Sequence, residues 1–191
     1  MVSFRSAVKA AGAVLVPESI DAISLTVRYA TDHCIDLAVR GASHSTAGSS
    51  STDGGLLIDL GSSTLFTQVQ VDEARRHLIA GGGANWGHVD EAGFAAGLVT
   101  VGCTVHDTGI GGLTLEGGYG WLSGKLGLTI DNLVSVKLVV ADGRDENQDL
   151  FWALRGAGQN FGVAVQFVYQ GHAFGTGFPA EQVAGAEGGQ A

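Results

Sequence analysis

Residues 108–121 read TGIGGLTLEGGYGW, and six of these fourteen residues are glycine. Glycine at this density disfavours both helix and central strand, because glycine loses more backbone freedom on folding than any other residue. A backbone without Cβ atoms can instead lie directly against a ligand. The stretch therefore predicts a segment packed against a flat ligand, and tight structural turns are the other interpretation.

A second stretch, residues 39–48, reads VRGASHSTAG and begins in an apolar run. Its small residues would let backbone N–H groups approach a pyrophosphate, with Arg40 available to offset the negative charge. The alternative interpretation is an ordinary surface loop rich in glycine and serine, in which His44 is incidental. Composition does not decide between the two.

The overall composition excludes several classes of protein. Of the 191 residues, 31 are Gly and 2 are Pro, with no Gly-X-Y period, so collagen and low-complexity sequence are excluded. The hydrophobic fraction of 45% indicates a packed core. Ten Lys and Arg against nineteen Asp and Glu give a net charge of −9, which argues against nucleic acid as a partner.

Short motifs exclude further chemistry. Cys34 and Cys103 are far apart and form no CxxC pair, so neither a disulfide framework nor a metal site is predicted. The stretch from Gly109 to Thr114 fails the GxGxxG fingerprint at its last position, and the zinc HExxH and GxSxG motifs are absent. No apolar run is long enough for a membrane span, and no convincing signal peptide precedes the domain. The default location is therefore the cytoplasm, and secretion stays open.

Hydrophobic periodicity predicts a mixture of strands and helices. Strands are expected at residues 13–16, 37–40, 56–60, 133–141 and 163–169, with a hairpin from 69–71 to 77–80. Helices are expected at 20–32 after an N-cap at Ser19, at 85–96 before Gly97, and at 149–155 before Gly156. Because no regular βαβ rhythm emerges, the predicted class is α+β. Residues 1–170 form the predicted domain, and 171–191 lose apolar periodicity, as is typical of a disordered tail.

The two glycine-rich stretches, in this order, resemble the FAD-binding domain of the berberine bridge enzyme-like oxidases. These belong to the p-cresol methylhydroxylase and vanillyl-alcohol oxidase type of flavoproteins. The family hallmarks are Arg-x-Gly-Gly-His-Ser and Gly-x-Gly-Gly-x-x-x-Gly-Gly-Tyr-Gly, matched here by residues 40–45 and 109–120. Further matches lie at residues 54–60, 127–133, 141–143, 149–156 and 160–163. The resemblance implies two α+β subdomains with FAD between them.

The resemblance also implies the residues of a cofactor site. His44 stands at the family's covalent attachment point, where an imidazole nitrogen bonds the flavin 8α-methyl carbon. The loop around it would hold the pyrophosphate, and the later glycines would line the isoalloxazine. The residues expected to bind FAD are Arg40, Gly41, Ala42, Ser43, His44, Ser45, Gly48, Gly109, Gly112, Gly117, Gly118, Gly120, Gly162 and Val163.

Two departures from the family pattern concern this site. Ala42 and Ser43 replace the usual Gly-Gly, so a positive φ at either position would strain the loop. Relatives that attach FAD a second time through Cys would carry that Cys at Val105, two residues from Cys103. A single linkage through His44 is therefore expected. His106 and Asp107 approach the same region, either lining the pocket or as solvated loop residues.

The implied activity is that of an FAD-dependent oxidase. A small organic substrate would donate hydride to the flavin, and O₂ would accept the electrons. Family members continue through a substrate domain that carries the usual catalytic base, which we expect this chain to lack, and a short deletion is expected after Arg144. No catalytic residue or metal ligand is therefore assigned. The alternative is a truncated FAD-binding fragment without turnover.

Overall fold

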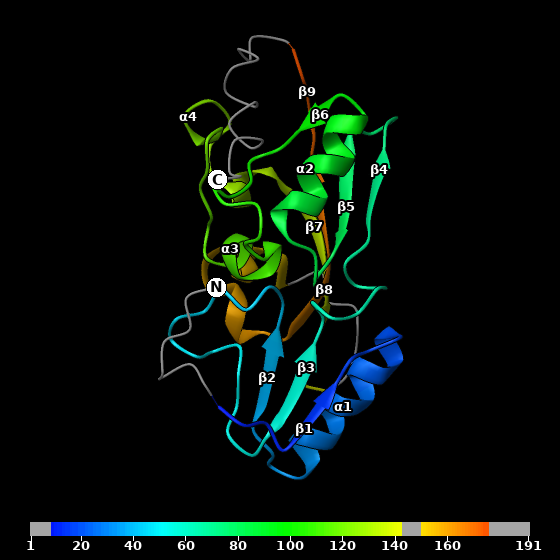
Figure 1. Cartoon of the computed structure of the whole chain (residues 1–191), viewed down its shortest axis with the longest axis vertical. Coiled ribbons are helices and arrows are strands. Elements are labelled where there is room, and N and C mark those ends of the chain that lie inside the picture. The colour runs from blue at the N-terminus through cyan, green and yellow to red at the C-terminus, as the bar shows by residue number, and fades with distance from the viewer. Residues whose placement is uncertain (1–8, 143–149, 176–191) are drawn as a thin grey trace, which may run out of the picture.

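A three-stranded parallel sheet forms the N-terminal part of the protein, in the lower half of Figure 1. The computed structural model describes residues 9–142 and 150–175. Its first sheet has the order β1-β3-β2, from β1 (Ala13–Leu15), β2 (Leu37–Arg40) and β3 (Leu56–Asp59). Helix α1 (Ile20–Asp32) connects β1 to β2, as strands of the same direction require. It begins after Ser19, whose hydroxyl accepts the Ala22 N–H at 3.1 Å.

A four-stranded antiparallel sheet forms the upper half of Figure 1, in the order β4-β5-β8-β7. Its strands are β4 (Val69–Asp72), β5 (His77–Gly81), β8 (Val163–Gln170) and β7 (Leu133–Val139). Helix α2 (Trp86–Ala95) lies against β4 and β5, and its N-cap Asn85 accepts the His88 N–H. A short ladder of β6 (Leu98–Val99) and β9 (His172–Ala173) extends beyond α2.

Short helices fill the space between and beside the two sheets. They are α3 (Ile110–Leu115), α4 (Ser123–Leu126), η2 (Thr129–Asn132), α5 (Phe151–Ala157) and η4 (Gly158–Asn160). The main core contains Trp86, Ile110, Phe167 and Tyr169, all fully buried. A second core joins Ile23 and Ile58 of the lower part to Val139 and Val165 of the upper sheet. The two halves therefore share apolar packing.

The α+β class and most of the expected elements are confirmed. The predicted strands correspond to β1, β2, β3, β7 and β8, the hairpin to β4 and β5, and two of the predicted helices to α1 and α2. The helix predicted at 149–155 corresponds to α5, which runs from Phe151 to Ala157, so Gly156 lies inside the helix and not at its end. Residue 149 lies outside the described residues. The short deletion expected after Arg144 also falls largely outside the described residues. None of the helices in the described ranges is long and apolar enough to cross a bilayer.

Two expectations from the sequence need correction. Part of the glycine-rich stretch forms helix α3, because Ile110 and Thr114 are completely buried and this packing outweighs the poor helix propensity of Gly111 and Gly112. The domain also extends beyond residue 170, since β9 pairs with β6 within the segment expected to be a disordered tail. Residues 176–191 of that predicted tail lie outside the described part of the chain.

Candidate cofactor site

A cleft of about 780 Å³ lies where the two halves of the protein meet. This volume falls in the range of roughly 300–1,000 Å³ that is usual for ligand sites. One wall consists of β2 and the loop that follows it, and the other of α3 with its preceding residues and the start of β8. Of the predicted site residues, the cleft brings together Gly41, Ala42, Ser43, His44, Ser45, Gly109, Gly112, Gly162 and Val163.

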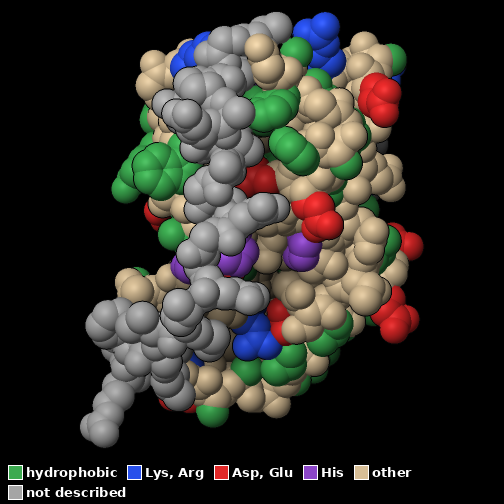
Figure 2. Space-filling view, turned by 45° about the horizontal axis from the view of Figure 1, so that its top comes forward, with side chains coloured by type: hydrophobic (Ala, Val, Ile, Leu, Met, Phe, Trp, Pro, Cys, Tyr) green, Lys and Arg blue, Asp and Glu red, His purple; other side chains and the backbone are tan. Residues whose placement is uncertain are grey.

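His44 lines this cleft, and its imidazole contacts the carboxylate of Asp107, which comes just before Thr108 and Gly109 of the opposite wall. Its Nε2 is 3.1 Å from Oδ1 of Asp107, and the side chains are 46% and 58% exposed. Figure 2 shows histidine side chains gathered across the middle of one face of the molecule, with acidic side chains nearby. Two loops 63 residues apart in sequence thus meet at His44.

Ser43 adopts the conformation that was expected to strain the loop. Its φ is +62°, in the left-handed region that disfavours residues with a Cβ. The loop is fixed further along, where Ser45 and Ser49 join their hydroxyls at 2.7 Å and the Ser49 N–H donates to Ser45 Oγ. The loop therefore holds an unfavourable backbone angle directly beside His44.

Arg40 has a different place from the one expected. Its guanidinium donates to Asp59 at 2.6 Å, linking β2 to β3, while Ser62 Oγ donates to the same carboxylate. The described residues lining the cleft include Val39 and Gly41 on either side but not Arg40. Burial alone would raise the pKa of Asp59, but the hydrogen bonds from Arg40 and Ser62 outweigh it and hold that pKa below its ordinary value. The Asp59 hydrogen bond likewise raises the pKa of Arg40.

The glycines of the cleft leave room for a ligand. A Cβ added at Gly112 would meet no atom within 4 Å, so the backbone of α3 is open toward the cleft there. At Gly109 a Cβ would stand 3.0 Å from the Ala42 nitrogen, which shows how closely the two walls approach. Gly82 also lines the cleft and was missed, although the Gly81–Gly83 run marked a break after the predicted hairpin.

Four other glycines expected at the cofactor do not line the cleft, namely Gly48, Gly117, Gly118 and Gly120. Gly48, Gly117 and Gly118 have φ values of +76°, +100° and +73°, so each serves a turn. A Cβ at Gly118 would lie 2.6 Å from Thr129 Oγ1, and one at Gly120 would lie 1.8 Å from the Gly102 carbonyl. None of the four is among the described residues of the cleft, so their contact with the cofactor stays a prediction.

The far wall of the cleft includes residues without a sequence signal. Glu116 and Gln159 hydrogen-bond to each other there, from the end of α3 and from η4. Cys103 packs against the main core, and neither Cys103 nor Val105 is among the described lining residues. The His106 carbonyl accepts the Gly87 N–H at 2.7 Å, while its side chain is exposed.

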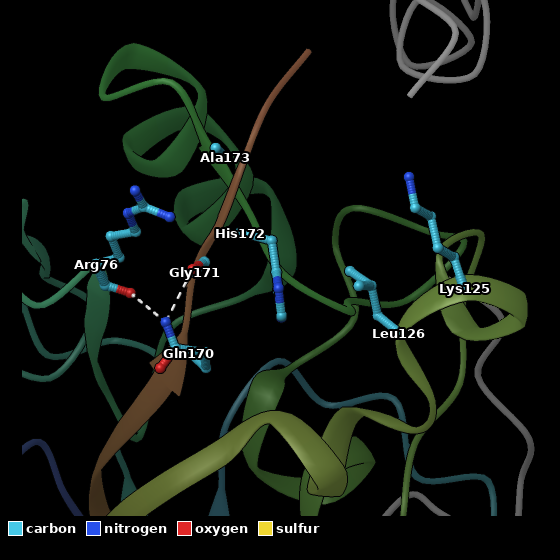
Figure 3. Close-up of a pocket in the computed structure, with 7 residues that line it drawn as sticks. All are labelled: Arg76, Lys125, Leu126, Gln170, Gly171, His172 and Ala173. Atoms are coloured by element: carbon cyan, nitrogen blue, oxygen red, sulfur yellow. Dashed lines mark hydrogen bonds between the residues drawn. The ribbon is translucent and has the colours of Figure 1, made fainter. Parts of the chain in front are cut away.

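A second, smaller cavity of about 510 Å³ lies away from the cleft and shares none of its described lining residues (Figure 3). Arg76 faces Lys125 and Leu126 across it, and Gln170 donates to the carbonyls of Arg76 and Gly171. His172 Nε2 lies 2.7 Å from Asn132 Oδ1, and burial lowers the pKa of His172.

A glycine-lined cleft between two α+β halves, with a loop of hydroxyls on one wall, defines a domain that binds a nucleotide cofactor. The chain belongs to the family described as FAD binding domain, whose model matches residues 11–149. FAD is therefore the cofactor of this domain, and the open backbone at Gly112 and the small residues of the opposite wall would fit a flat ring system.

Similar proteins are FAD-linked oxidoreductases and oxidases. The chain is 42% identical to the FAD-linked oxidoreductase pgmH of Aspergillus terreus over 90% of its own length and 35% of that protein's. Among solved structures, 6-hydroxy-D-nicotine oxidase from Arthrobacter nicotinovorans superposes with a TM-score of 0.78 at 33% identity, covering 84% of this chain and 36% of that one. A chitooligosaccharide oxidase reaches a TM-score of 0.78 at 29% identity, over 90% and 38%. The chain thus spans about a third of the length of these relatives.

Proposed function

We propose that this domain serves an oxidase that holds FAD covalently through His44, takes a hydride from a small organic substrate and passes the electrons to O₂. The observation that carries the proposal is the position of His44, which lies in the wall of the cleft. Neutral imidazole is a competent nucleophile, and the names of the relatives support the oxidase class.

The chain's own residues would bind and orient the cofactor. FAD, when bound, supplies the ring that accepts and releases electrons. The loop from Gly41 to Ser45 offers backbone N–H groups and hydroxyls to phosphate oxygens, which suits anion binding without a side-chain cation. Gly112 would let the ring approach the backbone, since it lines the cleft and an added Cβ there would meet no atom within 4 Å.

Denaturation of the protein in acid after incubation with FAD tests the covalent bond. We expect flavin fluorescence to stay with the denatured chain and the chain mass to rise by one FAD. His44→Ala should remove both signals while leaving the fold intact, because the side chain is half exposed. His33→Ala is the matched control, since His33 is an exposed histidine just after α1. Flavin that stays with the His44→Ala chain, or leaves the unchanged chain, would contradict the proposed linkage.

A second proposal is that these residues bind FAD without turning over a substrate. Only two titratable side chains, His44 and Glu116, are among the described residues lining the cleft. With His44 bonded to the cofactor and Glu116 held by Gln159, the described cleft offers no further base for a substrate proton. Hydrogen peroxide release by the purified chain, screened with alcohols, sugars and amines, separates the two proposals, because any turnover excludes the second.

A further inference from the structure

The segment that carries Asp107 is fixed on both sides by backbone hydrogen bonds. Before it, the His106 carbonyl accepts the Gly87 N–H at 2.7 Å; after it, the Thr108 carbonyl accepts the Trp86 N–H at 3.0 Å. Both donors belong to the first turn of α2, and Trp86 is fully buried. Asp107 is therefore presented from a rigid support, although its own side chain is exposed.

The loop with His44 runs beside this support. Gly109 lies so close to Ala42 that an added Cβ would be 3.0 Å from the Ala42 nitrogen. Ser43 has a left-handed backbone angle, and His44 follows it directly. The His44 Nε2 lies 3.1 Å from Asp107 Oδ1. The two backbones that carry the pair are thus packed closely together, although both side chains are partly exposed.

The contact determines where the imidazole carries its proton. An ionised carboxylate only accepts hydrogen bonds, so Nε2 must be the N–H that donates to Asp107. In the neutral ring the lone pair then lies on Nδ1. Carboxylates that accept from one ring nitrogen in this way fix the tautomer and orientation of histidines that react through the other nitrogen.

We propose that Asp107 is a positioning residue for covalent attachment: it holds His44 by Nε2–H, leaves Nδ1 as the nucleophile and accepts the Nε2 proton as the bond forms. This inference rests on the proposed linkage through His44. In the net reaction a C–H bond of the flavin 8α-methyl group breaks and a bond from that carbon to Nδ1 forms. Two protons leave, one from the methyl group and one from Nε2, together with two electrons. O₂ accepts the two protons and the two electrons and becomes hydrogen peroxide.

The exposure of the pair makes the inference testable, because exposed ion pairs contribute little to stability. The full chain, prepared without flavin, is mixed with FAD, and total bound flavin is measured separately from acid-stable flavin over time. We expect Asp107→Ala and Asp107→Asn to bind FAD as the unchanged chain does but to attach it roughly 10–100-fold more slowly. Asp107→Glu should recover much of the rate, and Glu91→Gln, an exposed carboxylate on α2, should not alter it.

The bonding nitrogen gives a readout that a purely structural role would not change. In a flavin peptide cut from the protein, the 8α protons lie near the histidine β protons if Nδ1 is bonded, and near Hδ2 if Nε2 is bonded. We expect the Nδ1 contact by NMR in the unchanged chain, and a share of Nε2 linkage in Asp107→Asn. Attachment at the normal rate in Asp107→Ala, or linkage at Nε2 in the unchanged chain, would overturn this inference alone. Acid-stable flavin absent from the unchanged chain would overturn the proposed linkage as well.

Discussion

The glycines at the two ends of α3 serve different purposes, although sequence gives them the same appearance. At the start of the helix, Gly112 faces the cleft and an added Cβ would enter open space. Beyond its end, an added Cβ at Gly120 would lie 1.8 Å from a carbonyl oxygen of another segment. Glycine density therefore indicates close approach of the backbone, but not whether a ligand or the protein itself lies opposite.

The largest effect is expected from Gly120→Ala. The added methyl group would overlap the Gly102 carbonyl, so the backbone of one segment must move. We expect the free energy of unfolding to fall by about 3 kcal/mol, at the upper end of the range for overpacking substitutions. Urea denaturation followed by circular dichroism measures it. Gly124→Ala, where a Cβ meets no atom within 4 Å, is the control and should lose little.

The same comparison extends to Arg40, a charged residue that was expected to bind the cofactor. It instead forms an ion pair with Asp59 and does not line the described cleft. Arg40→Ala leaves the buried Asp59 carboxylate without its cation. We expect a loss of about 2 kcal/mol in stability, less than the roughly 3–5 kcal/mol of fully buried pairs because Arg40 is 36% exposed and solvent screens it. FAD affinity, corrected for the folded fraction, should change little; a large specific loss would return Arg40 to the cofactor site.

The Arg40–Asp59 pair also predicts a pH dependence. Because the folded-state pKa of Asp59 lies below its unfolded value, the stabilisation is present above the unfolded value of about 3.9 and is lost as the pH falls through the lower folded value. The unchanged chain should therefore lose stability more steeply below pH 4 than Asp59→Asn does. Denaturation midpoints between pH 3 and 6 measure the difference, and parallel curves would contradict the prediction.

Gly112→Val tests the cleft side of the comparison and should have the smallest effect on stability. Helix propensity changes by less than about 1 kcal/mol, and nothing within 4 Å opposes a Cβ. FAD binding should weaken by about tenfold or more, since the side chain occupies ligand space. Fluorescence titration measures the affinity, and Gly156→Val, on α5 and equally unobstructed, is the matched control. Unchanged affinity would show that the ring does not reach Gly112.

Local patterns were sufficient where a segment's conformation depends on its own residues. Ser19 and the apolar spacing after it predicted α1, and the alternation in 163–169 predicted β8. Helix α3 and strand β9 could not be predicted in this way, because burial of Ile110 and pairing with β6 stabilise them from outside. The Arg40–Asp59 and His44–Asp107 pairs join residues far apart in sequence, and only the fold reveals which partner each side chain has.

The core shared between the two sheets limits how the cleft can change. Val139 and Val165 of the upper sheet pack in one cluster with Ile23 and Ile58 of the lower part. Separating the halves to admit a ligand would expose this cluster to water, at about 25 cal/mol per Å² of apolar surface. We therefore expect the two halves to keep a fixed arrangement around the cleft and to unfold in one transition. Bound FAD should raise the melting temperature of both halves together.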